Sequence, residues 1–152
     1  MKMKLLLSGL ALALSSGYTL TAFSQVKPDV LVKQRQAAMT LQGKYFGPMA
    51  GMAQGKVPYR ADVVTYNASL LDALSRMPWD GFTDATKDVK SATLPSAWSE
   101  AAKFKQAQDN FQNAVQGLVR ASKGGDEAAT KAAIGAVGKQ CGACHQDFRQ
   151  KN

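Results

Sequence analysis

Apolar residues recur every three or four positions along four separate stretches of the chain, a spacing that predicts four amphipathic helices. The first three stretches cover about residues 29–54, 61–76 and 95–123, and the fourth begins at about residue 126. Glycine, proline and short polar runs separate them, and no strand-like alternation follows the N-terminal segment. Four helices joined by three connections predict an all-α, antiparallel four-helix bundle, a fold that places cofactors between its helices.

The same spacing predicts which residues face the core. Gly55 and Pro58 are expected to end the first helix, and Asp126 is expected to cap the last. Trp79 and Phe82 enter the longest connection, residues 80–94, where they either pack against the core or wall a cofactor. The expected inward-facing residues, in chain order, are Leu31, Arg35, Ala38, Gln42, Tyr45, Met49, Met52, Val63, Asn67, Leu70, Leu74, Met77, Trp98, Ala101, Phe104, Phe111, Val115, Leu118, Ile134, Val137, Cys141, Cys144 and Phe148.

The last predicted helix contains the motif CGACH at residues 141–145. Two thiols separated by two residues and followed at once by an imidazole are typical of a c-type haem attachment site. Each thiol can add to one vinyl group of a haem, and His145 then supplies a nitrogen that can coordinate the iron. The motif therefore predicts one haem c per chain, attached covalently through Cys141 and Cys144 on the C-terminal helix.

Other readings of this motif explain less of it. A thioredoxin-like redox pair needs a βαβ context, which the pattern does not contain. A structural zinc site needs four ligands, and the chain contains only two cysteines and one histidine. A structural disulfide leaves the adjacent histidine without a role. Haem attachment accounts for all three side chains.

The N-terminal segment has the features of a secretory signal peptide. Two lysines precede an apolar run over residues 5–14, and small residues occupy positions 22 and 24. We therefore expect a signal peptide over residues 1–24 and a single haem domain over residues 25–152. The apolar run is short for a bilayer span, so a retained anchor is the weaker alternative and no stable membrane insertion is expected. Export to a bacterial periplasm also suits cysteines that must meet haem outside the reducing cytosol.

The 152-residue chain carries a formal net charge of +8, which bears on its partners. A basic surface can steer a protein toward an acidic redox partner or an anionic membrane, although lysines spread along helices are usually just solvated. Nucleic acid is not expected as a partner, because basic and aromatic residues are not interleaved. The redox partner itself is not encoded in the pattern.

The position of the motif narrows the class of cytochrome. Seven residues follow His145 and none is methionine, so any second iron ligand must come from upstream. Together with the motif, four upstream blocks resemble the cytochrome c′ family, the four-helix-bundle c-type cytochromes. These blocks are VKQRQAAMT at residues 32–40, QGKVPY at 54–59, LSRMPW at 74–79 followed by Phe82, and WSEAAKF at 98–104, and the motif is followed by Phe148 and Arg149.

This resemblance implies an iron with His145 on one side and no protein ligand on the other. Met39 would pack the open face, where nitric oxide and carbon monoxide could bind. Arg149 would lie beside His145. Arg35 and Gln36 would lie at the haem propionate edge, where a guanidinium suits carboxylate oxygens. Trp79 and Phe82 are expected to complete the haem pocket.

Met39 leaves one alternative open. In the related cytochromes c556 a first-helix methionine binds the iron, which would make this chain a six-coordinate electron carrier with His145 and Met39 as ligands. An enzymatic role is not expected, because the only histidine is already assigned and a peroxidase-like mechanism needs a second acid–base group. The resemblance also covers both monomers and antiparallel homodimers formed through the first two helices, with Val32, Phe46 and Val64 as candidate contact residues.

Overall fold

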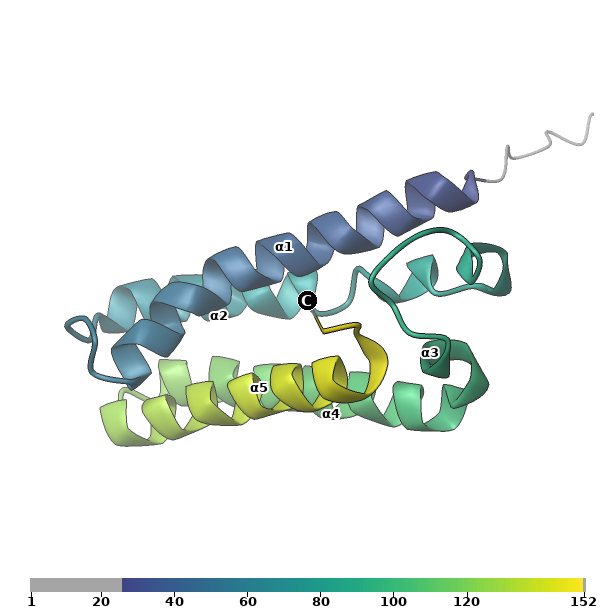
Figure 1. Ribbon diagram of the computed structural model, residues 1–152. Helices are drawn as coiled ribbons and strands as arrows, with labels where there is room; N and C mark the ends of the chain where they lie inside the picture. Colours follow the sequence, from purple (N-terminus) through teal and green to yellow (C-terminus); the bar gives the residue numbers. More distant parts are fainter. Residues whose placement is uncertain (1–25, 152) are drawn as a thin grey trace, which may run out of the picture.

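The computed structural model describes residues 26–151 and consists of helices joined by short connections. The long helices are α1 (Pro28–Ala53), α2 (Ala61–Leu74), α4 (Ala101–Lys123) and α5 (Glu127–Phe148). A short helix, α3 (Ser96–Ser99), and two 3₁₀ turns, Trp79–Gly81 and Asp84–Thr86, occupy the connection between α2 and α4. Consecutive long helices run in opposite directions, with α1 and α2 lying against α4 and α5 (Figure 1). The predicted all-α, antiparallel four-helix bundle is confirmed.

Local chemistry sets the helix ends close to the predicted positions. Gly55 adopts a left-handed φ of 70° just after α1, a conformation that costs glycine little. Its N–H donates to Met52 O and that of Lys56 donates to Gly51 O, the two hydrogen bonds of a Schellman motif. Asp126 caps α5 by accepting a hydrogen bond from Ala129 N at 3.0 Å.

The prediction of the third helix was wrong in one respect, because this stretch is divided at Glu100 into two helices. That residue has φ −112° and ψ 46°, which is outside the helical region. The break separates α3 from α4. Trp98 of α3 packs on Phe82 with ring centroids 6.3 Å apart, and its indole N–H donates to Thr83 O. The break at Glu100 therefore lets α3 pack against the connection instead of continuing along the axis of α4.

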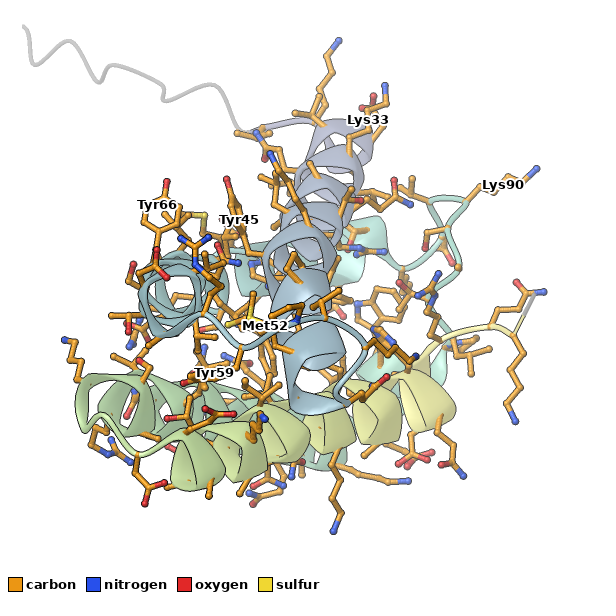
Figure 2. The ribbon with its side chains drawn as sticks, turned by 90° about the vertical axis from the view of Figure 1, so that its left-hand side faces the viewer. Lys33, Tyr45, Met52, Tyr59, Tyr66 and Lys90 are labelled. Atoms are coloured by element: carbon orange, nitrogen blue, oxygen red, sulfur yellow. The ribbon has the colours of Figure 1, made fainter. Side chains whose placement is uncertain are left out.

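Residues from all four long helices form the core (Figure 2 shows Met52 among them). Met49 and Met52 are buried as predicted. On α2, Asn67 and Leu74 are buried as predicted, but Val63 and Leu70 are only partly buried, and their neighbours Val64 and Leu71 are buried instead. Apolar residues occur in adjacent pairs on α2, so periodicity alone could not choose between the two faces. The buried core consists of Met49, Met52, Val64, Ala68, Leu71, Phe111, Val115, Leu118, Ile134 and Val137.

Four further predictions of burial or exposure were wrong. Met77 lies beyond the end of α2 and is 56% exposed, and Ala101 at the start of α4 is also exposed. Val32 and Val64 are 3% and 0% exposed, so they belong to the interior and cannot provide a contact between subunits. Within residues 26–151, no helix has the length and apolarity needed to cross a bilayer.

Candidate functional site

A cavity of about 500 Å³ is lined mainly by residues of α1 and α5. These two helices lie on opposite sides of the bundle (Figure 1). The size of the cavity is within the range of about 300–1,000 Å³ typical of ligand and cofactor pockets. All nine site residues predicted from the sequence line it. The lining consists of Arg35, Gln36, Met39, Thr40, Gln42, Gly43, Phe46, Leu71, Trp79, Phe82, Ala92, Thr93, Phe104, Phe111, Gln140, Cys141, Cys144, His145, Phe148 and Arg149.

The last turns of α5 bring two thiols and an imidazole to this cavity. Cys141 and Cys144 are free and partly buried, one turn apart on the same side of the helix. Burial raises the pKa of the Cys141 thiol to about 11, and it also raises the pKa of Cys144. Burial and the nearby Arg149 lower the pKa of His145, which favours the neutral imidazole that can coordinate a metal.

Arg149 follows the end of α5 and lines the cavity beside His145, as expected from the sequence. Its backbone N–H donates to His145 O at 3.2 Å, and residues 93 and 149 form an isolated antiparallel bridge. His145 and Arg149 also line a second, smaller cavity of about 200 Å³, together with Gln150 and Lys151. The chain end is therefore held against the connection that precedes α3.

On the opposite wall, α1 presents Met39 to the cavity together with Gln42 and Phe46. These residues are three and four positions apart and so share one side of the helix. Gln36 and Thr40 are exposed at the rim, where the Thr40 hydroxyl donates to Gln36 O at 2.9 Å. Met39 of α1 and the thiols and imidazole of α5 therefore line the same cavity.

Arg35 lines the cavity, but its guanidinium is committed to the connection between α2 and α4. It is 3% exposed and donates to Gly81 O, to Thr86 Oγ1 at 3.2 Å, to Ser91 Oγ at 3.1 Å and to Thr93 Oγ1 at 3.2 Å. It also stacks over the Phe82 ring at 4.4 Å. The sequence could not reveal this use of Arg35, because all of its partners lie 46–58 residues away.

An aromatic cluster closes the end of the cavity near Arg35. The Phe82 and Phe104 ring centroids are 4.8 Å apart, and those of Phe104 and Phe148 are 5.1 Å apart. The Trp79 ring packs against the rings of both Phe82 and Phe104, and its indole N–H donates to Ser75 O at 2.6 Å. Phe104 and Phe148 were expected only in the core, and their place in the cavity wall follows from the packing of α4 on α5.

Eleven of the cavity residues have no role in the site predicted from the sequence, among them Gln42, Phe46 and Phe111. Gln42 was expected to face inward, and a polar residue in an otherwise apolar seam is the signal that could have identified it. Phe46 lies 3.2 Å from the position that a Cβ on Gly138 would occupy, so α1 approaches α5 closely at this point. Nothing in the sequence distinguishes Phe46 and Phe111 from ordinary core residues, so their place in the cavity wall could not be predicted.

The donor set and the cavity fit the haem that the motif predicts. A covalent haem needs two free thiols one helical turn apart, an imidazole beside them, and an apolar space large enough for the macrocycle. The cavity between α1 and α5 combines all of these, with aromatic and aliphatic side chains forming most of its wall. None of the lining residues is a second histidine, since the chain contains one.

Comparison with known proteins supports this assignment at the level of the whole chain. The family profile described as Cytochrome C′ matches residues 30–149. A cytochrome c′ of Rubrivivax gelatinosus is 43% identical over 126 residues, which cover 82% of this chain and 98% of that protein. A cytochrome c′ of Alcaligenes xylosoxydans xylosoxydans is 40% identical over 82% of this chain and 97% of its own. A cytochrome c-556 of Rhodopseudomonas palustris is 31% identical over 87% of this chain and 91% of its own.

Solved structures give the same result. The crystal structure of the Rubrivivax gelatinosus cytochrome c′ matches with a TM-score of 0.78 and 42% identity, over 82% of this chain and 98% of that chain. A nitric oxide complex of a cytochrome c′ variant from Alcaligenes xylosoxidans matches with a TM-score of 0.78 and 39% identity, over 84% and 98%. A carbon monoxide-bound variant of the same protein matches with a TM-score of 0.77 and 40% identity, over 83% and 98%. By sequence, by fold and by the residues that its cavity gathers, the chain belongs to the cytochrome c′ family.

Proposed function

We propose that this chain is an exported c-type cytochrome with one haem c in the cavity between α1 and α5. Cys141 and Cys144 hold it through thioether bonds, and His145 is the axial ligand of its iron. When bound, the haem supplies an iron centre that can take up a small gas or exchange an electron. The observation that carries this proposal is that one cavity is lined by two free thiols and an imidazole from α5 and by Met39 from α1.

The ligands that we propose for the α1 side of the cavity are nitric oxide and carbon monoxide. Met39, Phe46 and Leu71 make this side largely apolar, which suits small uncharged gases and excludes larger or charged ligands. Variants of the related Alcaligenes xylosoxidans protein have been solved with each of these gases. Electron transfer to an unspecified periplasmic partner is compatible with the same site, and we propose no catalytic reaction.

The pocket residues have distinct roles in this proposal. Arg149 lies beside His145 and influences the imidazole on the α5 side. Trp79 and Phe82 wall the haem at the end of the cavity. Gln36, exposed at the rim, is placed to meet the propionates. For Arg35 the proposal is narrower, because its four hydrogen bonds to the connection use the donors that a propionate would otherwise receive.

A second candidate function is supported by Met39 itself. Its thioether lies on the wall opposite His145, and a cytochrome c-556 is among the relatives. If Met39 coordinates the iron, the protein is a six-coordinate electron carrier rather than a gas-binding protein. A thioether ligand favours a low-spin iron with a raised reduction potential.

Export is part of the proposal. The expected signal peptide, residues 1–24, and residue 25 lie outside the described residues. We propose cleavage before Gln25, a periplasmic location and a mature haem domain of residues 25–152. N-terminal sequencing of the protein from a periplasmic extract checks all three points. An intact N-terminus in a membrane fraction would contradict them.

The test of the main proposal is the absorption and EPR spectrum of the purified ferric protein, repeated after reduction and exposure to nitric oxide. A high-spin or mixed-spin signal and ready binding of nitric oxide are expected. A low-spin signal with a methionine–iron charge-transfer band would favour the electron carrier. Haem staining of a denaturing gel comes first, because absence of covalent haem would exclude both functions.

A further inference from the structure

The α1 wall of the cavity contains one buried polar side chain that the proposed function does not use, Gln42. It is 8% exposed and lines the cavity three residues after Met39, on the same side of the helix. The neighbouring polar residues of this wall are otherwise engaged. Arg35 binds the connection after α2, and Gln36 and Thr40 are exposed at the rim. Gln42 is therefore the polar group that α1 places in the interior beside Met39.

A hydrogen bond determines how the Gln42 amide is oriented. Its Nε2 donates to Leu74 O at the end of α2, at 2.9 Å. Only the nitrogen of an amide can donate, so the bond places Nε2 toward α2 and leaves the carbonyl oxygen directed elsewhere. Among the described residues, every fully buried side-chain nitrogen or oxygen has a hydrogen-bond partner. Because Gln42 bonds through its nitrogen, its oxygen must be accessible, and the space beside it is the cavity.

We propose that Gln42 is a specificity-determining residue for small molecules on the α1 side of the cavity. This inference rests on the proposed function, since it concerns the same site. An acceptor oxygen in a mostly apolar space favours molecules that donate a hydrogen bond, such as water, ammonia or hydroxylamine. It disfavours carbon monoxide and nitric oxide, which have no donor and whose outer oxygen gains negative charge on binding. The cavity thus discriminates by hydrogen bonding as well as by size.

The test compares Gln42→Leu with Gln112→Leu in the haem-containing protein, with carbon monoxide as the probe. Gln112 is a matched control, because its Nε2 donates to Ser75 O at the same end of α2, at 3.1 Å, but it does not line the cavity. Gln42→Leu is expected to raise the carbon monoxide affinity of the reduced protein roughly 3- to 10-fold, the equivalent of one ordinary hydrogen-bonding interaction. It is also expected to lower the C–O stretching frequency, because a negative dipole near the ligand oxygen has been removed. Gln112→Leu should change neither.

Three outcomes would overturn this inference. Equal spectra and affinities for wild type and Gln42→Leu would show that Gln42 acts only as a cap of α2. A rise in the stretching frequency would show that an N–H group, rather than the oxygen, faces the ligand. Equal effects of Gln42→Leu and Gln112→Leu would trace the change to the end of α2.

The same comparison in a Met39→Ala background separates this inference from the proposed function. If the wild type does not bind carbon monoxide because Met39 coordinates the iron, Met39→Ala opens that face. A higher affinity and lower frequency of Met39→Ala/Gln42→Leu relative to Met39→Ala would then support the role of Gln42, although the gas-binding function had failed. No difference between these two variants would overturn it.

Discussion

At the scale of single residues, the geometry of the site depends on a few positions whose side chains cannot be exchanged freely. Met39 lines the cavity from α1, and the thiols and imidazole line it from α5. Gly81 lies so close to α1 that a side chain at this position would collide with the helix. Each position can be tested by one substitution with a clear expected direction.

Replacing Met39 by Ala distinguishes steric packing from iron coordination. If Met39 only packs the open face, Met39→Ala should leave the resting ferric spectrum unchanged and accelerate the binding of ligands larger than nitric oxide. The reason is that truncation removes the thioether side chain from the wall without altering the iron ligands. Stopped-flow absorption measures the rates. A conversion of the resting spectrum from low spin to high spin would instead identify the sulfur as a ligand.

Gly81→Ala is expected to destabilise the protein by about 1–3 kcal/mol, the usual cost of forcing extra volume into a packed site. A Cβ at this position would lie 3.0 Å from both Arg35 Cβ and Leu31 O. Denaturant unfolding of the protein measures the change. Gly135→Ala in α5 is the control, because its Cβ meets nothing within 4 Å and should stabilise the helix by about 0.5–1 kcal/mol. Equal effects of the two substitutions would contradict the close approach.

At the scale of elements, the connection from residue 79 to residue 95 acts as the end wall of the cavity although it contains little regular structure. It is held by side chains from outside it, of which Arg35 makes the largest number of hydrogen bonds. Its two 3₁₀ turns and the Trp79 and Phe82 rings depend on this attachment to α1.

Arg35→Met should therefore release the connection. Loss of the guanidinium removes four hydrogen bonds to the connection, although Gly81 O still accepts from Thr86 Oγ1 and Ser91 Oγ still accepts from Thr93 N. The expected decrease in the free energy of unfolding is roughly 2–4 kcal/mol. Amide hydrogen exchange should accelerate over residues 81–93 more than in the α4 and α5 cores. Arg76→Met is the control, because Arg76 forms only a surface ion pair with Asp72 at 3.0 Å, and its loss should cost little. Unchanged exchange over residues 81–93 would contradict the anchoring role.

At the scale of the whole molecule, the remaining question is the surface that α1 and α2 present. Tyr45 of α1 and Tyr66 of α2 project to the same side of the bundle (Figure 2). Tyr66 is 63% exposed and Leu41 is 39% exposed, whereas the valines first considered for a subunit contact are buried. An antiparallel homodimer that forms through α1 and α2 would bury Tyr66 and Leu41.

If the chain dimerises through this surface, the wild type should sediment as a dimer and Tyr66→Glu as a monomer, because a charge in the contact would have to be desolvated. Analytical ultracentrifugation measures both. Asn113→Glu, at an exposed position of α4, carries the same change of charge and should remain dimeric. A wild-type protein that is monomeric at every concentration would decide for the monomer, the other state that the resemblance leaves open.

The helices and the attachment motif could be predicted from local pattern because their causes are local. Gly55 ends α1 and Asp126 begins α5 through hydrogen bonds to residues within five positions, which neighbouring letters of the sequence reveal. The spacing of Cys141, Cys144 and His145 is likewise contained in five consecutive residues. Such features are independent of how the helices pack.

Packing between segments distant in the sequence determined the features that the hydrophobic pattern left open or predicted incorrectly. The buried face of α2, the break at Glu100 and the binding of Arg35 to residues 46–58 positions away all depend on contacts between distant segments. The placement of Gln42 depends on the same cause, because its partner Leu74 lies 32 residues further along. A periodic pattern specifies that a helix has an apolar side. Only the neighbouring helices determine how that side is rotated and which polar groups find partners within the interior.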